Sequence, residues 1–284
     1  MENKTAIITG GTSGLGLVLV KTFLQKQCNV VFCARTAKDV QLVTAELSNY
    51  KDKLVGIVGD IRAAETSNLL ITSALSIFKS VDIVISNAGV QGPIGPIEAN
   101  NVQDWKEALD INLYGPIYLT RAALPIFKEN RSGKLIFVSG GGATSPMPMF
   151  SSYATAKAGL IRFMETVAME TREYGITVNA VAPGALKTRF TQAVLDAGEK
   201  LAGKEAYNSN LQRETNGGAD PQLAANLCYF LASQASQQIT GKLISAQWDN
   251  WPELNMFAES LAISDIYTLR RITEKERPNL WKKK

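Results

Sequence analysis

The chain has 284 residues, of which 45% are hydrophobic and 20% are charged, and its formal net charge is +4. This composition is typical of a globular protein with one sizeable core. Much of the positive charge comes from the Lys282–Lys284 tail, so nucleic acid is not an expected partner. The complete absence of histidine excludes His-based catalytic triads, His metal sites and imidazole proton shuttles.

The three cysteines, Cys28, Cys33 and Cys228, do not have the spacing of metal ligands, so no metal site is expected. Cys28 and Cys33 bracket an apolar run, and we interpret these two as core thiols of a reducing compartment. No apolar run is long enough to span a membrane, and the start of the chain lacks the layout of a signal peptide. The expected location is therefore cytoplasmic, without a membrane partner.

A glycine-rich turn follows the first apolar run, Thr5–Thr9, and precedes a stretch with helical periodicity, Leu17–Leu24. The order of strand, glycine turn and helix is the context that a dinucleotide-phosphate site requires, although a plain tight turn is the alternative. Backbone N–H groups and the helix amino terminus favour a bound anion. The phosphate-binding residues expected here are Gly10, Thr12, Ser13, Gly14, Leu15 and Gly16.

The second predicted strand, Asn29–Ala34, ends where the mononucleotide fold places an acidic residue against the adenosine ribose. Here Ala34 occupies that place and Arg35 follows it. A guanidinium pairs with a 2′-phosphate, and no carboxylate at that place repels one. The sequence therefore favours NADP(H), with NAD(H) possible. The alternative is that Arg35 is only a surface residue.

Strands and helices then alternate along the chain without a break in composition, which predicts one α/β domain over residues 1–246. The near-continuous apolar strands fit a parallel sheet covered on both faces. Further strands are expected at Lys53–Gly59, Val81–Ser86, Lys134–Ser139, Ile176–Val181 and Lys242–Ala246. Helices are expected at Val40–Leu47, Glu65–Phe78, Asp104–Phe127, Ser151–Tyr174 and Asp220–Leu231, with kinks at Pro116 and Pro125.

Two polar stretches lie outside this alternation. Residues 185–216 are dotted with glycine and show only weak helical patterns. A long loop after the carboxyl end of a parallel strand typically forms a lid over a ligand. Residues 247–284 form a carboxy-terminal extension with Trp248, Trp251 and Trp281, which we expect to pack on the body or on a neighbouring subunit. The alternative is that Trp248 and Asp249 bind a sugar.

Tyr153 and Lys157 are four residues apart on the predicted Ser151–Tyr174 helix, so their side chains lie on one face. A nearby ammonium favours the phenolate and brings the pKa of a tyrosine toward neutrality. Such a tyrosine exchanges a proton with an alcohol or a carbonyl. Taken alone, the pair is more often an ordinary exposed helix face.

The motifs together resemble the short-chain dehydrogenase/reductase family from Thr5 to about Ile244. They comprise Thr9-Gly-x-x-x-Gly-x-Gly16, Asp60, Asn87-Ala-Gly89, Asn112, a serine before the active helix, Tyr153-x-x-x-Lys157 and Pro183-Gly184. The resemblance implies a doubly wound, mostly parallel, Rossmann-like sheet. It also implies an NAD(P)-dependent oxidoreductase acting on CH–OH groups of small molecules, as a homodimer or homotetramer.

Carried over residue by residue, the resemblance makes Tyr153 the general acid/base and has Lys157 hold the nicotinamide ribose. Asn112 anchors a water that connects Lys157 to solvent. It further implies that the cofactor is bound by Asp60, Ile61, Asn87, Ala88, Gly89, Pro183, Gly184 and Thr188, together with the glycine turn, Arg35, Tyr153 and Lys157.

One position departs from the family pattern. The serine that orients the substrate usually lies about thirteen residues before the tyrosine, and Gly140 holds that place. Ser139 is the preferred candidate for the role, because the following glycines allow a shift of one residue. Thr144 and Ser145 are the next candidates. Weak carbonyl polarisation leaves two other functions open, a cofactor-binding sensor or scaffold, and a lyase or epimerase with retained cofactor. A sugar- or polyol-derived substrate is a further expectation.

Overall fold

A seven-stranded, entirely parallel sheet forms the centre of the protein, in the order β3-β2-β1-β4-β5-β6-β7. The computed structural model describes residues 1–277. The order reverses between β1 and β4, as in doubly wound nucleotide-binding folds. The strands are β1 Thr5–Thr9, β2 Asn29–Ala34, β3 Leu54–Val58, β4 Ile83–Ser86, β5 Gly133–Val138, β6 Ile176–Ala182 and β7 Leu243–Ser245.

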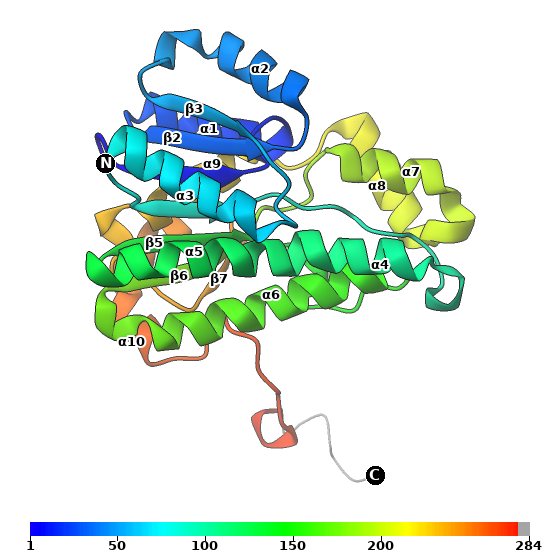
Figure 1. Ribbon diagram of the computed structural model, residues 1–284. Helices are drawn as coiled ribbons and strands as arrows, with labels where there is room; N and C mark the ends of the chain where they lie inside the picture. Colours follow the sequence, from blue (N-terminus) through cyan, green and yellow to red (C-terminus); the bar gives the residue numbers. More distant parts are fainter. Residues whose placement is uncertain (278–284) are drawn as a thin grey trace.

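Helices cover both faces of this sheet (Figure 1). They are α1 Gly14–Gln25, α2 Ala37–Glu46, α3 Ala64–Phe78, α4 Val102–Leu109, α5 Gly115–Glu129, α6 Ser151–Glu170, α7 Arg189–Ala202, α8 Lys204–Asn216, α9 Pro221–Ala232 and α10 Ala258–Ala262. One buried cluster joins the sheet to α1, α2, α9 and α10, and a second joins it to α3, α5 and α6. No helix within residues 1–277 is both long and apolar enough to cross a membrane.

The fold class confirms the sequence-based prediction, and two elements differ from it. The single helix expected at Asp104–Phe127 is α4 and α5 joined by a π-helical turn, Asp110–Tyr114. Pro116 lies in the first turn of α5, directly after the π-helical turn. The weak helical patterns of residues 185–216 are two full helices, α7 and α8, that pack along each other.

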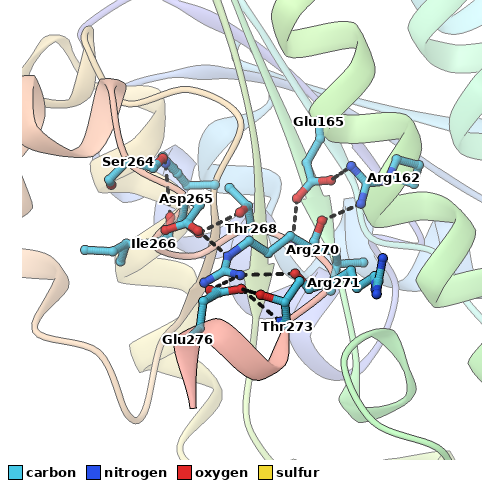
Figure 2. Close-up of polar contacts among 12 residues, drawn as sticks. Arg162, Glu165, Ser264, Asp265, Ile266, Thr268, Arg270, Arg271, Thr273 and Glu276 are labelled. Carbon is cyan, nitrogen blue, oxygen red and sulfur yellow. Dashed lines mark hydrogen bonds and ion pairs between the residues drawn. The ribbon is translucent and has the colours of Figure 1, made fainter. Parts of the chain in front are cut away.

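The carboxy-terminal segment lies along the exposed edge of the sheet. The Leu243 N–H of edge strand β7 donates to the Tyr267 carbonyl at 2.8 Å. The buried Lys242 ammonium donates to the Ser264 and Ile266 carbonyls at 2.8 and 3.0 Å. Figure 2 shows the same segment meeting α6, where the Glu165 carboxylate accepts from the Leu269 N–H. The segment thus covers backbone groups of an edge strand that otherwise remain unpaired.

Two of the three tryptophans lie in the described part of this extension, and they differ. Trp251 packs against Phe230 of α9 with ring centroids 5.8 Å apart, and its indole N–H donates to the Ala246 carbonyl. Trp248 is 79% exposed and lies at the wall of the cleft described below. The Trp251 ring therefore packs on the body of the protein, whereas the Trp248 ring is largely exposed. Trp281 lies outside the described residues.

Candidate active site

A cleft of about 1360 Å³ opens at the carboxyl ends of the strands. Ligand pockets commonly have volumes of about 300–1,000 Å³, so this cleft has room for more than one small ligand. Every residue that the sequence assigned to cofactor binding lines it, and three of the four assigned to catalysis do too. These are Gly10, Thr12, Ser13, Gly14, Leu15, Gly16, Arg35, Asp60, Ile61, Asn87, Ala88, Gly89, Ser139, Tyr153, Lys157, Pro183, Gly184 and Thr188.

The glycine turn is packed so tightly that side chains are excluded from it. A Cβ on Gly16 would lie 1.9 Å from the Gly10 carbonyl oxygen and 2.6 Å from the Asn87 amide nitrogen. Ser13 is the N-cap of α1, yet its hydroxyl makes no capping hydrogen bond. The first N–H groups of α1 also lack partners within the helix. This cradle of free donors at a helix amino terminus suits the phosphates of a dinucleotide.

Asn87 connects the end of β4 to the end of β1. Its amide donates to the Thr9 carbonyl at 3.0 Å, and the Thr9 hydroxyl accepts from the N–H groups of Asn87 and Ala88 at 3.1 Å each. Because the amide faces neighbouring carbonyls, Asn87 fixes the shape of the cleft at the point where the strand order reverses.

A charged network surrounds the far end of the cleft, near Arg35. The Asp60 carboxylate accepts from the Arg62 guanidinium at 2.6 and 2.9 Å. Burial opposes the charge on Asp60, but the hydrogen bonds from Arg62 outweigh it and lower the pKa of the carboxyl group. Arg62 also pairs with Glu107 of α4 at 3.0 Å, and Arg35 lies 3.9 Å from the same carboxylate. The Arg35 side chain, 56% exposed, is held only loosely.

Tyr153 and Lys157 lie together in the wall of the cleft, both on α6 and both buried. The Lys157 ammonium lies 5.8 Å from the centroid of the Tyr153 ring and donates to the Val138 carbonyl at 2.9 Å. The edge of the Tyr153 ring also meets Phe190 of α7, with centroids 5.9 Å apart. The carbonyl end of β5 and the start of α7 therefore position the pair.

Burial determines the titration of both groups in the protein alone. It raises the pKa of Tyr153 to about 12 and lowers that of Lys157 to about 8. The sequence-based expectation was that the ammonium would bring the phenol toward neutrality, and here desolvation outweighs this attraction. Tyr153 is consequently protonated at neutral pH, which is the form that donates a proton.

Asn112 lies beneath the cleft in the π-helical turn and is fully buried. Its amide nitrogen donates to the Val90 and Ala108 carbonyls at 2.9 and 2.8 Å, and its amide oxygen accepts from the Val90 N–H. A Cβ on Gly89 would lie 2.8 Å from that oxygen and 3.8 Å from the Lys157 ammonium. Asn112 therefore fixes the loop after β4 at a position next to the Lys157 ammonium.

Gly140 leaves room for the tyrosine hydroxyl. A Cβ at this position would lie 2.0 Å from the Tyr153 hydroxyl oxygen. Ser139 is buried, and its hydroxyl has no hydrogen-bond partner in the described structure. Because side chains alternate along extended backbone, Ser139 points away from the side on which Gly140 meets Tyr153. Thr144 and Ser145 also line the cleft.

The other end of the cleft lies under the α7–α8 pair, where an apolar cluster adjoins polar side chains of α8. A third buried cluster combines Tyr153 and Phe150 with Val194 and Ala202 of α7, and Met147, Met149 and Phe190 pack against it. Of the polar groups here, the Asp249 carboxylate already accepts from the Ser245 N–H at 2.6 Å. The arrangement provides an apolar pocket with a proton donor at its inner wall.

Four residues around the cleft were not singled out from the sequence. Arg62, Glu107, Phe190 and Arg213 belong to no motif, and only contacts across the fold bring them to the site. A weak local signal existed for Arg62, since an arginine two residues after Asp60 is well placed to pair with it. Within residues 1–277, no group of His, Cys, Asp or Glu side chains is arranged to hold a metal ion.

A doubly wound sheet with a dinucleotide cleft and a buried Tyr–Lys pair defines a nicotinamide-dependent oxidoreductase. Residues 4–198 match the family described as short chain dehydrogenase. The chain is 30% identical over 244 residues to "Dehydrogenase/reductase SDR family member 4" of Homo sapiens, covering 86% of each chain. It therefore belongs to the short-chain dehydrogenase/reductase family and is an NAD(P)-dependent oxidoreductase.

Two further comparisons agree with this assignment. "Dehydrogenase/reductase SDR family member 2, mitochondrial" of Homo sapiens is 29% identical over 245 residues, covering 86% of this chain and 85% of that one. The solved structure of the KRED1-Pglu enzyme superposes with a TM-score of 0.77 at 26% identity, covering 84% of this chain and 99% of that one.

Proposed function

We propose that the protein is an NADP(H)-dependent carbonyl reductase that converts a ketone to a secondary alcohol, with Tyr153 as the proton donor. The observation that carries this proposal is the buried Tyr153–Lys157 pair in the wall of the cleft that the glycine turn also lines. The bound cofactor supplies the hydride. Tyr153 delivers a proton to the carbonyl oxygen, so that ketone, reduced cofactor and one proton give alcohol and oxidised cofactor.

The protonation states support the direction of reduction. A pKa of about 12 keeps Tyr153 protonated at neutral pH, whereas oxidation of an alcohol needs the phenolate. Lys157, with a pKa of about 8, is positively charged at neutrality and stabilises the phenolate that forms when the proton leaves. The Val138 carbonyl holds this lysine in place, and Asn112 fixes the neighbouring loop that contains Gly89.

Three hydroxyls line the cleft as candidates for polarising the carbonyl, those of Ser139, Thr144 and Ser145. Ser139 remains our first proposal, because its buried hydroxyl is without a partner in the described residues and lines the cleft. Because the Ser139 side chain points away from the side on which Gly140 meets Tyr153, the test compares Ser139→Ala with Thr144→Val and Ser145→Ala. The variant with the largest fall in kcat at unchanged cofactor affinity identifies the hydroxyl.

The preference for NADP(H) rests on Arg35. Its guanidinium is exposed at the cleft and has only a long 3.9 Å contact with Glu107, so it is available to a 2′-phosphate. Asp39, in the first turn of α2, lines the same part of the cleft and opposes this preference. We expect Arg35→Ala to weaken NADP(H) binding far more than NAD(H) binding. Equal losses would make Arg35 a bystander.

Substrate and setting are proposed more broadly. The exposed Trp248 at the cleft wall fits stacking against a sugar- or polyol-derived ketone, while the apolar cluster under α7 fits aliphatic groups.

The three cysteines are buried free thiols, which supports a reducing location such as the cytoplasm. Met169, 82% exposed on α6, fits a homodimer or homotetramer contact, which light scattering would detect.

The decisive experiment follows nicotinamide absorbance with a panel of aliphatic and sugar-derived ketones. Tyr153→Phe removes the proton donor and keeps the ring that packs against Phe190. We expect turnover to be lost while cofactor affinity, measured by calorimetry, is retained. A Tyr153→Phe variant that stays active would show that the mechanism is wrong.

A specific observation favours one alternative function. Gly140 stands at the family serine position, and the Tyr153 hydroxyl occupies the space that a side chain there would need. This fits a cofactor-binding sensor or scaffold with little catalysis. Such a protein would bind NADPH by calorimetry and turn over none of the ketones. A lyase or epimerase with retained cofactor would instead give product without net oxidation of the cofactor.

A further inference from the structure

Arg213 of α8 is a charged group in the cleft that the reaction described above does not use. It lines the same cleft as Tyr153 and is partly buried. Its guanidinium donates to the Asn210 amide oxygen at 2.6 Å and to the Ser209 hydroxyl at 3.4 Å. A guanidinium has five N–H donors, so most of its capacity remains available.

No carboxylate within the described residues comes within 4.0 Å of this guanidinium. Two other cations around the cleft have a carboxylate within 4.0 Å, and two more are exposed to water. Lys187 pairs with Glu214 at 2.8 Å, and Arg35 lies 3.9 Å from Glu107. Arg189 and Lys204 are exposed, where water screens their charge. Burial lowers the pKa of Arg213, which reflects a positive charge partly removed from water without a counter-charge.

Asn210 holds the guanidinium in one orientation. It is 8% exposed and, as the buried residue of α8, its amide nitrogen donates to the Ala206 carbonyl at 2.8 Å, while its oxygen accepts from Arg213. A buried amide satisfied at both ends fixes the side chain that it contacts. Glu205, the acidic residue of α8 that lines the cleft, is eight residues and therefore about 12 Å away along the helix.

Glycines bracket the helix that carries Arg213. Gly203 before α8 and Gly217 after it both have φ of +81°, and a Cβ on either would meet nothing within 4 Å. Figure 1 shows α7 and α8 standing together beside the sheet. A helix with one buried residue between two glycines of positive φ has few buried contacts that fix its position over the cleft.

We propose that Arg213 is an anion-binding residue of the lid and ion-pairs with a carboxylate or phosphate group in the cleft beneath α8. Two sources share this chemistry. One is an anionic group on the ketone substrate, an assignment that rests on the proposed reductase function. The other is a phosphate of the cofactor. A planar guanidinium suits either group, because it binds two oxygen atoms side by side.

The test compares wild type with Arg213→Gln, Arg213→Lys and Lys200→Gln by isothermal titration calorimetry at low and high salt. Lys200 is exposed on α7 and does not line the cleft, so its variant controls for net charge. NADPH is titrated first. Inorganic phosphate and malonate are then titrated into the NADPH complex. Arg213→Gln retains a side-chain donor toward Asn210, and circular dichroism confirms folding.

We expect Arg213→Gln to weaken one of these ligands at least tenfold relative to Lys200→Gln, with partial recovery in Arg213→Lys and a smaller difference at high salt. Weaker NADPH binding identifies the cofactor phosphate, and weaker phosphate or malonate binding to the NADPH complex identifies a substrate anion. Unchanged NADPH affinity, together with no Arg213-dependent binding of either anion, would overturn the proposal. These measurements need no turnover, so they stand apart from the Tyr153→Phe test.

Discussion

The strand-end wall of the cleft and its proposed lid differ in how firmly their residues are held by burial and hydrogen bonds. In the wall, formed by the glycine turn, Asn87–Gly89 and Ser139–Gly140, the supporting groups are buried and hydrogen-bonded, as with Asn112 and Lys157. The proposed lid, α7 and α8, has few buried residues, and Gly198, Gly203 and Gly217 in or beside these helices have positive φ. Proton transfer needs groups in fixed positions, whereas ligand entry and selection need an element that moves.

The largest effect is expected where the wall is tightest. Gly16→Ala would place a methyl group 1.9 Å from the Gly10 carbonyl oxygen, and a backbone carbonyl cannot move aside cheaply. Overpacking costs about 1–3 kcal/mol, which corresponds to roughly 5- to 150-fold in affinity. We expect cofactor binding, measured by calorimetry, to weaken within or beyond that range.

Gly159→Ala on α6 is the matched control. Its new methyl group would meet only the end of the Leu113 side chain, at 3.3 Å, and alanine is the better helix former. Cofactor affinity should be unchanged in this variant. An equal loss in both variants would mean that the glycine turn is not a fixed cradle.

The sequence predicted the wall better than the lid, for a physical reason. The runs Thr5–Thr9 and Asn29–Ala34 have apolar centres, and the observed strands have these same bounds. Turn residues with fixed spacing follow those strands, so the groups they bring to the cleft were predictable. The two helices α7 and α8 bury few residues, and glycines interrupt α7 at Gly198 and flank α8 at Gly203 and Gly217, which left them as weak patterns.

The orientation of single side chains was beyond the sequence. Spacing placed Tyr153 and Lys157 on one face of α6, but the balance between burial and charge attraction depends on the Val138 carbonyl and on Phe190. Spacing also identified Gly140 as the departure from the family. Only the structure reveals that the tyrosine hydroxyl takes up the vacated space. No sequence motif pointed to Arg213. Its proposed role follows from the absence of a carboxylate partner within the described residues, which only the structure shows.

Gly140→Ala should produce the next largest effect. Its methyl group would lie 2.0 Å from the Tyr153 hydroxyl and displace it from the wall, so kcat should fall at least tenfold, or about 1.4 kcal/mol. Cofactor affinity should remain. Gly141→Ala is the control, since its Cβ would meet only the Met147 sulfur at 4.0 Å. Similar kcat values for the two variants would contradict the position that we assign to the hydroxyl.

The pH dependence of reduction should follow Lys157. As pH rises through about 8, the lysine loses its charge while Tyr153, with a pKa of about 12, keeps its proton. The group that stabilises the developing phenolate is then lost, so kcat/KM for ketone reduction should fall several-fold between pH 7 and pH 9. Initial rates at fixed ionic strength measure this. A profile that is flat or rises over that interval would show that the ammonium does not assist proton transfer.

The smallest effect is expected at the hinge of the lid. Gly203→Ala adds a methyl group that meets no atom within 4 Å, so its cost is confined to a backbone conformation (φ +81°, ψ 146°) that favours glycine, about 1–3 kcal/mol. A small rotation of α8 relieves that strain without disturbing the wall. We therefore expect the unfolding temperature to fall by no more than about 12 °C, cofactor affinity to be unchanged, and KM for the ketone to change more than kcat. Calorimetry and steady-state kinetics on the same preparation distinguish this outcome from the loss expected for Gly16→Ala. If Gly203→Ala weakened cofactor binding as strongly as Gly16→Ala, the lid would be as rigid a part of the cofactor site as the wall, and the contrast between them would be false.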